Sequence, residues 1–251
     1  METEKARLFA SLHKPGTPLI LFNAWDPGSA KVVAEAGAKA IATGSWSVAA
    51  AFGFEDGEAL PREIAIANLE RIVAAVDLPV TIDLEGGYGA APADVAASVA
   101  LAAAAGAVGC NFEDQIVGGE GLYPIDDQCE RIAAARKAGG DAFFLNARTD
   151  LFLKAEPEAH NSLVAAALDR ARAFAEAGAS GLFVPGLADE ELIGSVCAKS
   201  PLPVNIMAMP TTPPAIRLAR LGVARISHGP GPWRIAMQAL AEAARTAHNP
   251  A

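Results

Sequence analysis

The sequence predicts a single (β/α)8 barrel domain that spans residues 1–251. The first indication is a repeated local pattern, in which a helical segment ends at a glycine and a short apolar strand follows at once. The copies are AEAGAKAI (34–41), AAAGAVGC (103–110), AEAGASGL (175–182) and, more loosely, RLARLGVARIS (217–227). Glycine suits the left-handed backbone that ends a helix, and a tight helix-to-strand turn is what a repeated βα unit requires.

The second indication is that eight short apolar segments alternate with eight helical segments along the chain. The strand candidates are 18–23, 39–43, 79–84, 107–113, 142–147, 180–184, 203–207 and 223–227. The helix candidates are 27–37, 61–76, 92–105, 126–138, 160–177, 188–199, 212–221 and 231–246. Proline and capping residues mark several helix starts, as in Asp26-Pro27, Ala91-Pro92 and Thr212-Pro213-Pro214.

The apolar character of these strands indicates how they are arranged. They are apolar throughout rather than alternating, which is typical of parallel strands buried on both faces. The chain length of 251 residues also suits one barrel. An open, doubly wound sheet is the alternative, although no Gly-x-Gly-x-x-Gly fingerprint of dinucleotide binding follows the first strand.

The composition excludes several classes of partner. The formal net charge is -9 and no basic run occurs, which argues against binding to nucleic acid or to an anionic membrane surface. Three scattered cysteines, Cys110, Cys129 and Cys197, predict no disulfide framework and fit a cytoplasmic location. The first residues lack the apolar segment of a signal peptide, and the alanine-rich run 96–108 is too short to cross a bilayer.

Polar residues gather where the predicted strands end, which is the edge that carries the active site of such a barrel. In chain order they are Asn23, Trp25 and Asp26; Thr43 to Ser47; Asp83 and Glu85; Asn111, Glu113 and Asp114; Asn146, Arg148 and Asp150; Asn205; and Arg225, Ser227 and His228. Several carboxylates at one edge suit Mg²⁺, which prefers hard oxygen ligands. Only four histidines occur, and no paired His or Cys motif, which disfavours a zinc site.

Each of these residues also has a purely structural interpretation. A single strand-end carboxylate can cap a helix or pair with a lysine, but Asp83, Glu85 and Glu113 together would repel one another unless a cation neutralised them. Arg148 could be a structural ion-pair partner, and His228 could belong to a surface loop. The remaining histidines, His13, His160 and His248, are expected at the surface.

The glycine-rich segment DQIVGGEGLYPIDDQ (114–128) is longer than a typical barrel loop. It is interpreted as a lid over the strand ends. An insertion tolerated without function is the alternative.

Six motifs together resemble the isocitrate lyase / phosphoenolpyruvate mutase superfamily, in the expected order and from about residue 8 to 240. They are LFNAWDPGSAKVVAEAGAKAIATGS, FGFEDGE, DLEGGYG, NFEDQ, NARTDLF and PVNIM. The resemblance implies a (β/α)8 barrel whose C-terminal helix is exchanged between subunits, a homodimer or homotetramer, and a Mg²⁺ site. It also implies cleavage or rearrangement of a bond beside a 2-oxo or 2-hydroxy carboxylate, through an enolate.

The resemblance assigns roles to particular residues. It implies a metal site at Asp83, Glu85 and Glu113, in which Asp83 is the direct ligand and Glu85, Glu113 and Asp56 hold metal-bound water. It implies substrate binding by Gly44, Ser45, Trp46, Arg148 and Asn205, with Arg148 paired to the carboxylate. The candidate catalytic residues are Arg148, Glu113, Asp56 and His228.

The lid departs from the superfamily pattern. Lyases of the superfamily carry a cysteine with basic neighbours there, whereas this chain has Val117-Gly-Gly-Glu-Gly-Leu-Tyr123. A carbon–carbon lyase or a decarboxylase of an oxaloacetate-like acid is therefore the main hypothesis, with Glu120, Tyr123 or His228 as candidate proton donors. A carbon–phosphorus bond enzyme and a non-catalytic binder of 2-oxo acids are the alternatives.

Overall fold

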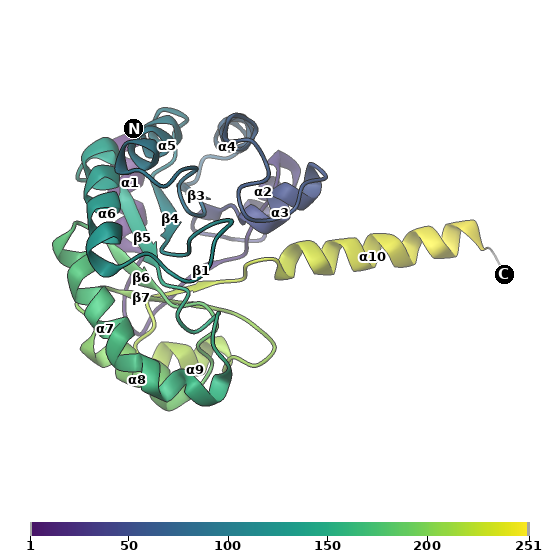
Figure 1. Ribbon diagram of the computed structural model, residues 1–251. Coiled ribbons are helices and arrows are strands. Elements are labelled where there is room, and N and C mark those ends of the chain that lie inside the picture. The colour runs from purple at the N-terminus through teal and green to yellow at the C-terminus, as the bar shows by residue number, and fades with distance from the viewer. Residues whose placement is uncertain (1, 250–251) are drawn as a thin grey trace.

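The prediction of a (β/α)8 barrel is confirmed in the computed structural model, which describes residues 2–249 (Figure 1). Its eight parallel strands are β1 (Leu19–Leu21), β2 (Ile41–Ala42), β3 (Val80–Asp83), β4 (Gly109–Glu113), β5 (Phe144–Arg148), β6 (Gly181–Phe183), β7 (Val204–Met207) and β8 (Arg225–Ser227). The hydrogen-bonded order β1-β8-β7-β6-β5-β4-β3-β2 contradicts the alternative of an open, doubly wound sheet. A parallel bridge between Ala24 and Thr43 closes the remaining gap, where Ala24 N–H donates to Ala42 O at 2.8 Å.

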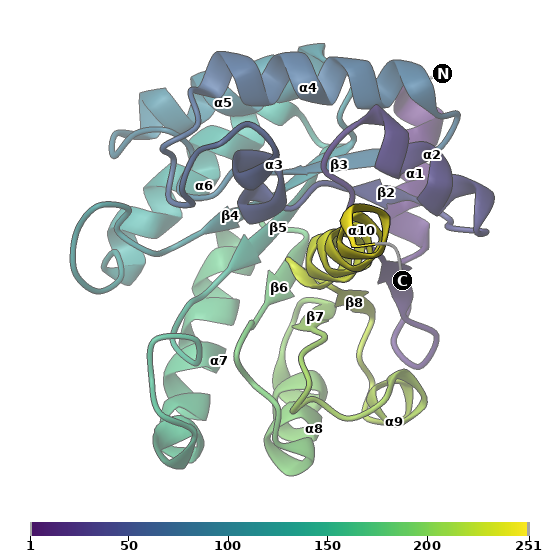
Figure 2. The same cartoon turned by 90° about the vertical axis from the view of Figure 1, so that its right-hand side faces the viewer.

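The helices surround the strands, as the views in Figures 1 and 2 show. They are α1 (Glu2–Ser11), α2 (Pro27–Glu35), α3 (Ser45–Ala51), α4 (Arg62–Ala75), α5 (Pro92–Ala104), α6 (Ile125–Gly139), the 3-10 turn η1 (Pro157–Ala159), α7 (His160–Glu176), α8 (Glu190–Lys199), α9 (Ala215–Arg220) and α10 (Gly231–His248). Every predicted helix is present, although α9 is shorter than predicted. Among the described residues, none of these helices is both long and apolar enough to span a membrane.

Three elements were not expected from the sequence: α1, α3 and η1. Helix α3 has only seven residues, too few to show a helical period. Helix α1 precedes the first strand and packs its Phe9 edge-on against Phe144 of β5, with ring centroids 5.5 Å apart. The ring of His13, just after α1, stacks on Phe144 at 3.9 Å. The expectation that His13 and His160 lie at the surface was wrong, because both are buried.

Side chains that cross the barrel interior form a polar layer. Arg225 of β8 donates to Asn111 Oδ1 of β4 at 3.0 Å, and Asn146 of β5 donates to the same oxygen at 2.9 Å. Asn205 of β7 contacts Ser227 of β8 at 3.1 Å. Such interiors are usually filled by branched apolar residues. The apolar core lies instead mainly between strands and helices, where Leu69, Ile72, Val95, Val99 and Phe174 are completely buried.

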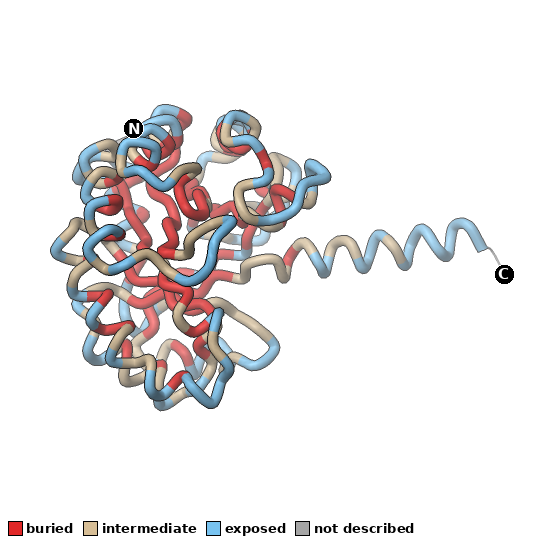
Figure 3. Tube along the Cα trace, in the orientation of Figure 1, coloured by how far each residue is buried: buried red, intermediate tan, exposed pale blue. Residues whose placement is uncertain are grey.

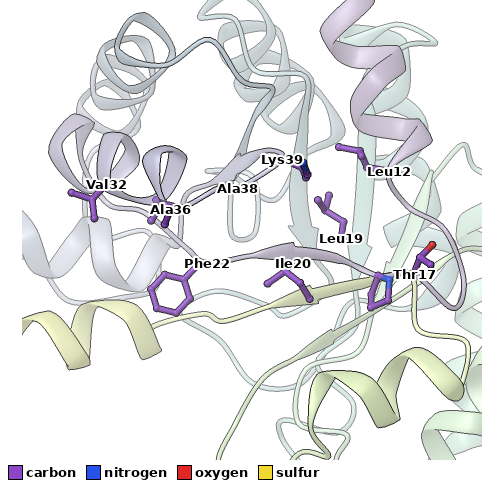
Figure 4. A pocket seen from close by; sticks show the side chains of 12 residues that line it. Leu12, Thr17, Leu19, Ile20, Phe22, Val32, Ala36, Ala38 and Lys39 are labelled. Atoms are coloured by element: carbon purple, nitrogen blue, oxygen red, sulfur yellow. The ribbon is translucent and has the colours of Figure 1, made fainter.

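The first turn of α10 packs on the barrel mouth, where Trp233 lies edge-on against Trp25 with ring centroids 5.1 Å apart. The rest of the helix extends away from the barrel (Figure 1), and most of its length is exposed (Figure 3). Its apolar residues Ile235 and Leu240 are 63% and 61% exposed. An apolar groove of about 510 Å³ lies between β1, α2 and the end of α1. Figure 4 shows Ile20, Phe22 and Val32 along this groove. The barrel therefore lacks an outer helix over β1, and the helix that follows β8 lacks a surface to cover.

The buried His13 ring is expected to make stability depend on pH. Burial, and then the nearby charge of Arg225, lower its pKa to about 3. Below pH 6.5 the His13 imidazole is therefore protonated in the unfolded chain but stays neutral in the folded chain. The free energy of unfolding thus falls as the pH drops from about 6.5 towards 3. This term amounts to roughly 2 kcal/mol between pH 7 and pH 5.

Urea unfolding of wild type and His13→Phe between pH 5 and 7 measures this contribution. The variant keeps the stacked ring but cannot titrate, so the difference between the two proteins should shrink or reverse as the pH falls. The exposed His248→Gln serves as control. Parallel pH profiles for wild type and His13→Phe would show that His13 is not held neutral.

Candidate active site

The motif DLEGGYG forms a tight turn after β3, at the mouth of the barrel. Glu85 and Tyr88 adopt positive φ values of 51° and 60°, which non-glycine residues rarely do. The turn directs Glu85 Oε2 at the backbone N–H groups of Gly57 and Glu58, at 2.8 and 2.9 Å. A Cβ on Gly86 would lie 2.8 Å from Val117 of the predicted lid. Glycine at this position therefore lets the lid segment pack directly on the turn.

Asp83, the last residue of β3, faces a set of polar groups at the same mouth. Its Oδ2 accepts from the Ser45 N–H at 3.3 Å and from the Ser45 hydroxyl at 3.1 Å. That hydroxyl also lies 3.3 Å from Asp56 Oδ1. Asp83 Oδ1 is buried and has no hydrogen-bond partner among the residues that the structure describes. A buried carboxylate oxygen left unpaired is costly, so this atom marks the place where a cation would be stabilised.

The carboxylates around Asp83 influence one another's ionisation. Burial and then the charges of Asp56 and Asp83 raise the pKa of Glu85 to about 7. Burial and then Asp83 raise the pKa of Asp56. Among the side chains described, residues 4–249, no three His, Cys, Asp or Glu groups converge as a ready set of metal ligands. The arrangement suits an ion held by Asp83 through one direct contact, with water between it and the other carboxylates, as Mg²⁺ commonly binds.

Arg148, the last residue of β5, is neutralised by two carboxylates. Its Nε and Nη2 bind both oxygens of Asp150 at 2.6 and 3.0 Å, and its Nη1 binds Glu113 Oε2 at 2.8 Å. Burial alone would lower the pKa of Arg148, but Glu113 and Asp150 outweigh it and hold the pKa above its ordinary value. These contacts lock the guanidinium in one orientation while leaving it at the wall of a cavity.

That cavity, of about 180 Å³, brings together residues from most strand ends. Its lining residues are Asn23, Gly44, Ser45, Trp46, Asp56, Asp83, Asn111, Arg148, Leu153, Phe183, Met207, Ser227, Gly229 and Pro230. It is smaller than the pockets that hold drug-sized ligands, which are typically about 300–1,000 Å³. A ligand that fills it would therefore be a small molecule, in contact with carboxylates, with Arg148 and with apolar side chains such as Phe183, whose ring centroid lies 5.9 Å from the Arg148 guanidinium.

Six predicted site residues, Gly44, Ser45, Trp46, Asp56, Asp83 and Arg148, line this one cavity. Glu85 and Glu113 lie beside it, bound to backbone N–H groups and to Arg148 respectively. Asn205 lies deeper, against Ser227.

His228 lies elsewhere. Its Nδ1 is 3.2 Å from Leu21 O, and its ring packs against Phe22, whose side chain borders the apolar groove. The structure therefore gives no geometric support to the prediction that His228 is catalytic.

The other two candidate proton donors also lie away from the cavity lining. The Tyr123 ring stacks over the guanidinium of Arg131, at 3.9 Å from ring centroid to carbon, and Glu120 is exposed. Asp150, Asn111 and Ser227 are site residues that the sequence did not single out. Each stood among the strand-end polar residues, but only the fold showed that Asp150 holds Arg148 and that Asn111 and Ser227 form the floor of the cavity.

Comparison with known proteins decides the family. Residues 9–248 match the family described as phosphoenolpyruvate phosphomutase. The chain belongs to this family. The phosphomutase family in turn lies within the isocitrate lyase / phosphoenolpyruvate mutase superfamily, as the sequence motifs predicted.

Individual relatives of this phosphomutase-family chain carry different activities in their names. The 2-methylisocitrate lyase of Salmonella typhimurium is 29% identical over 224 residues, which cover 81% of this chain and 74% of that protein. A Burkholderia cenocepacia J2315 protein, provisionally assigned as a phosphonomutase, is 54% identical with a TM-score of 0.96, covering 98% of this chain and 100% of that one. A phosphonopyruvate hydrolase in complex with oxalate and Mg²⁺ shares the fold, with a TM-score of 0.85 at 23% identity over 97% of this chain and 87% of that one.

Replacing Arg148 by methionine is expected to lower the free energy of unfolding by about 3–5 kcal/mol, because Glu113 and Asp150 would remain as buried, unpaired charges. Urea unfolding at neutral pH measures the loss. Arg217→Met, which removes an exposed partner of Glu190, should cost no more than about 1 kcal/mol. Equal losses in the free energy of unfolding would contradict the conclusion that Arg148 neutralises two buried carboxylates.

Proposed function

We propose that this protein is a cytoplasmic, Mg²⁺-dependent enzyme that cleaves a carbon–carbon bond beside a small 2-oxo or 2-hydroxy carboxylate, by way of an enolate. One observation carries the proposal: Asp83, with an unpaired buried oxygen, faces the same small cavity as Asp56 and the locked Arg148. This arrangement supplies a cation site and an anion site within reach of one small acid.

The residues around Asp83 fit Mg²⁺, since they supply carboxylate and hydroxyl oxygens, those of Asp56, Glu85 and Ser45. Asp83 would hold the ion directly, and Asp56, Glu85 and Glu113 would hold its water. When bound, Mg²⁺ polarises the oxygens of a chelated acid and stabilises negative charge that develops on them.

The chain's own residues bind and orient the acid. Arg148 keeps Nη protons beyond those given to Glu113 and Asp150, and it presents them at the cavity wall to the carboxylate. Gly44, Ser45 and Trp46 form the adjoining wall. Because Glu113 and Asp150 fix the guanidinium beforehand, little reorganisation accompanies binding.

Carbon–carbon chemistry is favoured over carbon–phosphorus chemistry by the charge of the cavity. Among the described residues that line it, Arg148 is the single cation, and it is already paired with two carboxylates. A phosphonate brings more negative charge than a second carboxylate or an apolar group. The apolar side chains of Leu153, Phe183 and Met207 in the lining suit a short apolar group on the substrate.

A binding protein without catalysis is the second candidate. The observation in its favour is that the cavity lining, as described, contains no His, Cys, Lys or Tyr that could serve as proton donor. The two candidates differ in a single outcome, namely whether the bound acid is converted.

Assembly through α10 accounts for the uncovered surfaces. We propose a homodimer, pairing into a homotetramer as the family resemblance implies, in which α10 of each subunit lies in the groove of the other. The exposed Ile235 and Leu240 of α10 and the exposed Ile20, Phe22 and Val32 of the groove support it. The cytoplasmic location is supported by three free cysteines, Cys110, Cys129 and Cys197.

The proposed function is tested with a panel of oxaloacetate, malate and citrate derivatives, assayed for 2-oxo acid release with and without Mg²⁺. We expect Mg²⁺-dependent turnover of at least one small acid. Asp83→Asn should weaken Mg²⁺ binding at least about 100-fold by calorimetry, since even supporting residues around a metal contribute 10–100-fold. The exposed Glu70→Gln is the control. Binding of an acid without conversion would favour the binding protein. A protein that neither binds nor converts any acid of the panel would contradict both proposals.

The assembly is tested by Ile235→Glu combined with Leu240→Glu. Charges at these two exposed apolar positions of α10 should abolish the dimer while leaving the barrel folded, as measured by light scattering and circular dichroism. Gln238→Glu adds a charge at an exposed polar position of the same helix and should leave the dimer intact. A wild-type monomer in solution would overturn the proposed assembly.

A further inference from the structure

Arg225 of β8 is a cation sealed inside the barrel, directly beneath the cavity. It is 0% exposed. Its Nε donates to Ser227 Oγ at 3.1 Å and its Nη2 donates to Asn111 Oδ1 at 3.0 Å. Its Nη1 has no partner in the described part of the chain. Within residues 4–249, no carboxylate forms an ion pair with it.

A buried charge without a counter-ion is unfavourable for folding alone. Burial lowers the pKa of Arg225 to about 9, against the raising effect of Asp83 and Cys110, so the group remains charged at neutral pH. Both of its acceptors, Asn111 and Ser227, line the cavity. The charge thus sits where it can act on whatever the cavity binds.

Asn111 is the group through which Arg225 can act. A guanidinium has donors and no acceptor, so the Asn111 atom that it touches must be the amide oxygen. Asn146 Nδ2 donates to the same oxygen at 2.9 Å. No acceptor among the described residues takes the Nδ2 protons of Asn111, and Asn111 belongs to the cavity lining. The amide therefore presents its N–H groups to the cavity.

Asn146 cannot enforce this orientation by itself. Its own amide carries both a donor and an acceptor, so Asn111 and Asn146 could turn over together and still form one hydrogen bond. Arg225 excludes the reversed arrangement, because it would then face an NH₂ group. Donation of two hydrogen bonds to Oδ1 also polarises the amide and strengthens its N–H groups as donors.

We infer that Arg225 is a positioning residue that fixes Asn111 as a hydrogen-bond donor to an oxygen of the bound acid, on the cavity floor next to the site marked by Asp83 and Arg148. This inference rests on the proposed function. It adds a recognition group for the carboxylate or 2-oxo oxygen of the substrate, and it explains why the interior of the barrel carries an arginine with no carboxylate partner.

Arg136 provides a matched comparison. It also donates only to neutral groups, the carbonyl oxygens of Gly140, Phe143 and Gly178 and the hydroxyl of Ser180. Those groups lie near the amino ends of β5 and β6, at the opposite end of the barrel from the cavity. Its loss should therefore affect stability alone.

The experiment measures oxalate binding by calorimetry in the presence of Mg²⁺, since oxalate is a small planar diacid that resembles an enolate of pyruvate. Asn111→Leu should weaken binding by roughly 10- to 100-fold, as expected for a lost hydrogen bond to a charged ligand. In Arg225→Gln the glutamine amide can accept a hydrogen bond as well as donate one, so it allows the reversed orientation of the Asn111 amide. This variant should therefore bind oxalate about tenfold more weakly. Arg225→Lys, which keeps a donor-only cation, should bind close to wild type.

The double variant Arg225→Gln/Asn111→Leu separates positioning from a direct effect of charge. If Arg225 acts through Asn111, the double variant binds no more weakly than Asn111→Leu. Losses that multiply, or equal affinities of Arg225→Gln and Arg225→Lys, would overturn the inference. Arg136→Met should lower the melting temperature without changing oxalate affinity.

The outcomes also separate this inference from the proposed function. Wild-type protein that binds no oxalate in Mg²⁺ contradicts the proposed site. If the wild type binds oxalate and Asn111→Leu binds it with the same affinity, only the roles of Asn111 and Arg225 are contradicted. Should the Arg225 variants fail to fold, Asn111→Leu still tests the inference, because an oxalate affinity equal to that of the wild type would overturn it.

Discussion

The mouth of the barrel is organised by the need to neutralise buried carboxylates. Two groups are neutralised within the chain: Glu113 and Asp150 share Arg148, and Asp114 pairs with Arg170 at 3.0 Å. Asp56, Asp83 and Glu85 have no such partner, and their mutual charge raises the pKa of Asp56 and Glu85 beyond what burial already does. The uncompensated negative charge is therefore confined to one side of the cavity. A cation bound there would complete the neutralisation, and Arg148 would offer an anion the N–H groups that Glu113 and Asp150 do not use.

Much of this arrangement could be predicted from the sequence. Helix-ending glycines such as Gly37, Gly106 and Gly178 have positive φ values of 92–105°, so the pattern that predicted the βα repeat has a direct physical cause. The carboxyl ends of parallel strands meet at one edge, so placing Asp83 and Arg148 at strand ends was enough to bring them together. Short elements without periodicity, such as α3, could not be recognised.

The direction of each side chain could not be predicted. Glu85 follows Asp83 by two residues and would point the same way on a continuing strand, but the backbone leaves the strand and turns Glu85 towards the N–H groups of Gly57 and Glu58. His228 follows Ser227, the last residue of β8, and its ring lies against Phe22 instead of in the cavity. Asp150 looked like one more strand-end carboxylate, because the sequence does not show that both of its oxygens bind Arg148, two residues earlier.

The segment interpreted as a lid, residues 114–128, is held at its base by the same kind of buried ion pair. Its first residue, Asp114, accepts from Arg170 and from the Asp150 N–H, and its backbone oxygen accepts from Tyr123 N–H at 2.8 Å. Arg170 also donates to Tyr123 O at 3.0 Å. Both ends are thus tied to one buried ion pair, whereas Gly118, Gly119 and Gly121 between them are exposed. The middle of the segment packs on the turn after β3, since Val117 lies against Gly86, and Ile116 N–H donates to Gly121 O at 3.2 Å. A lid anchored in this way would move without disturbing the carboxylates that the barrel has placed.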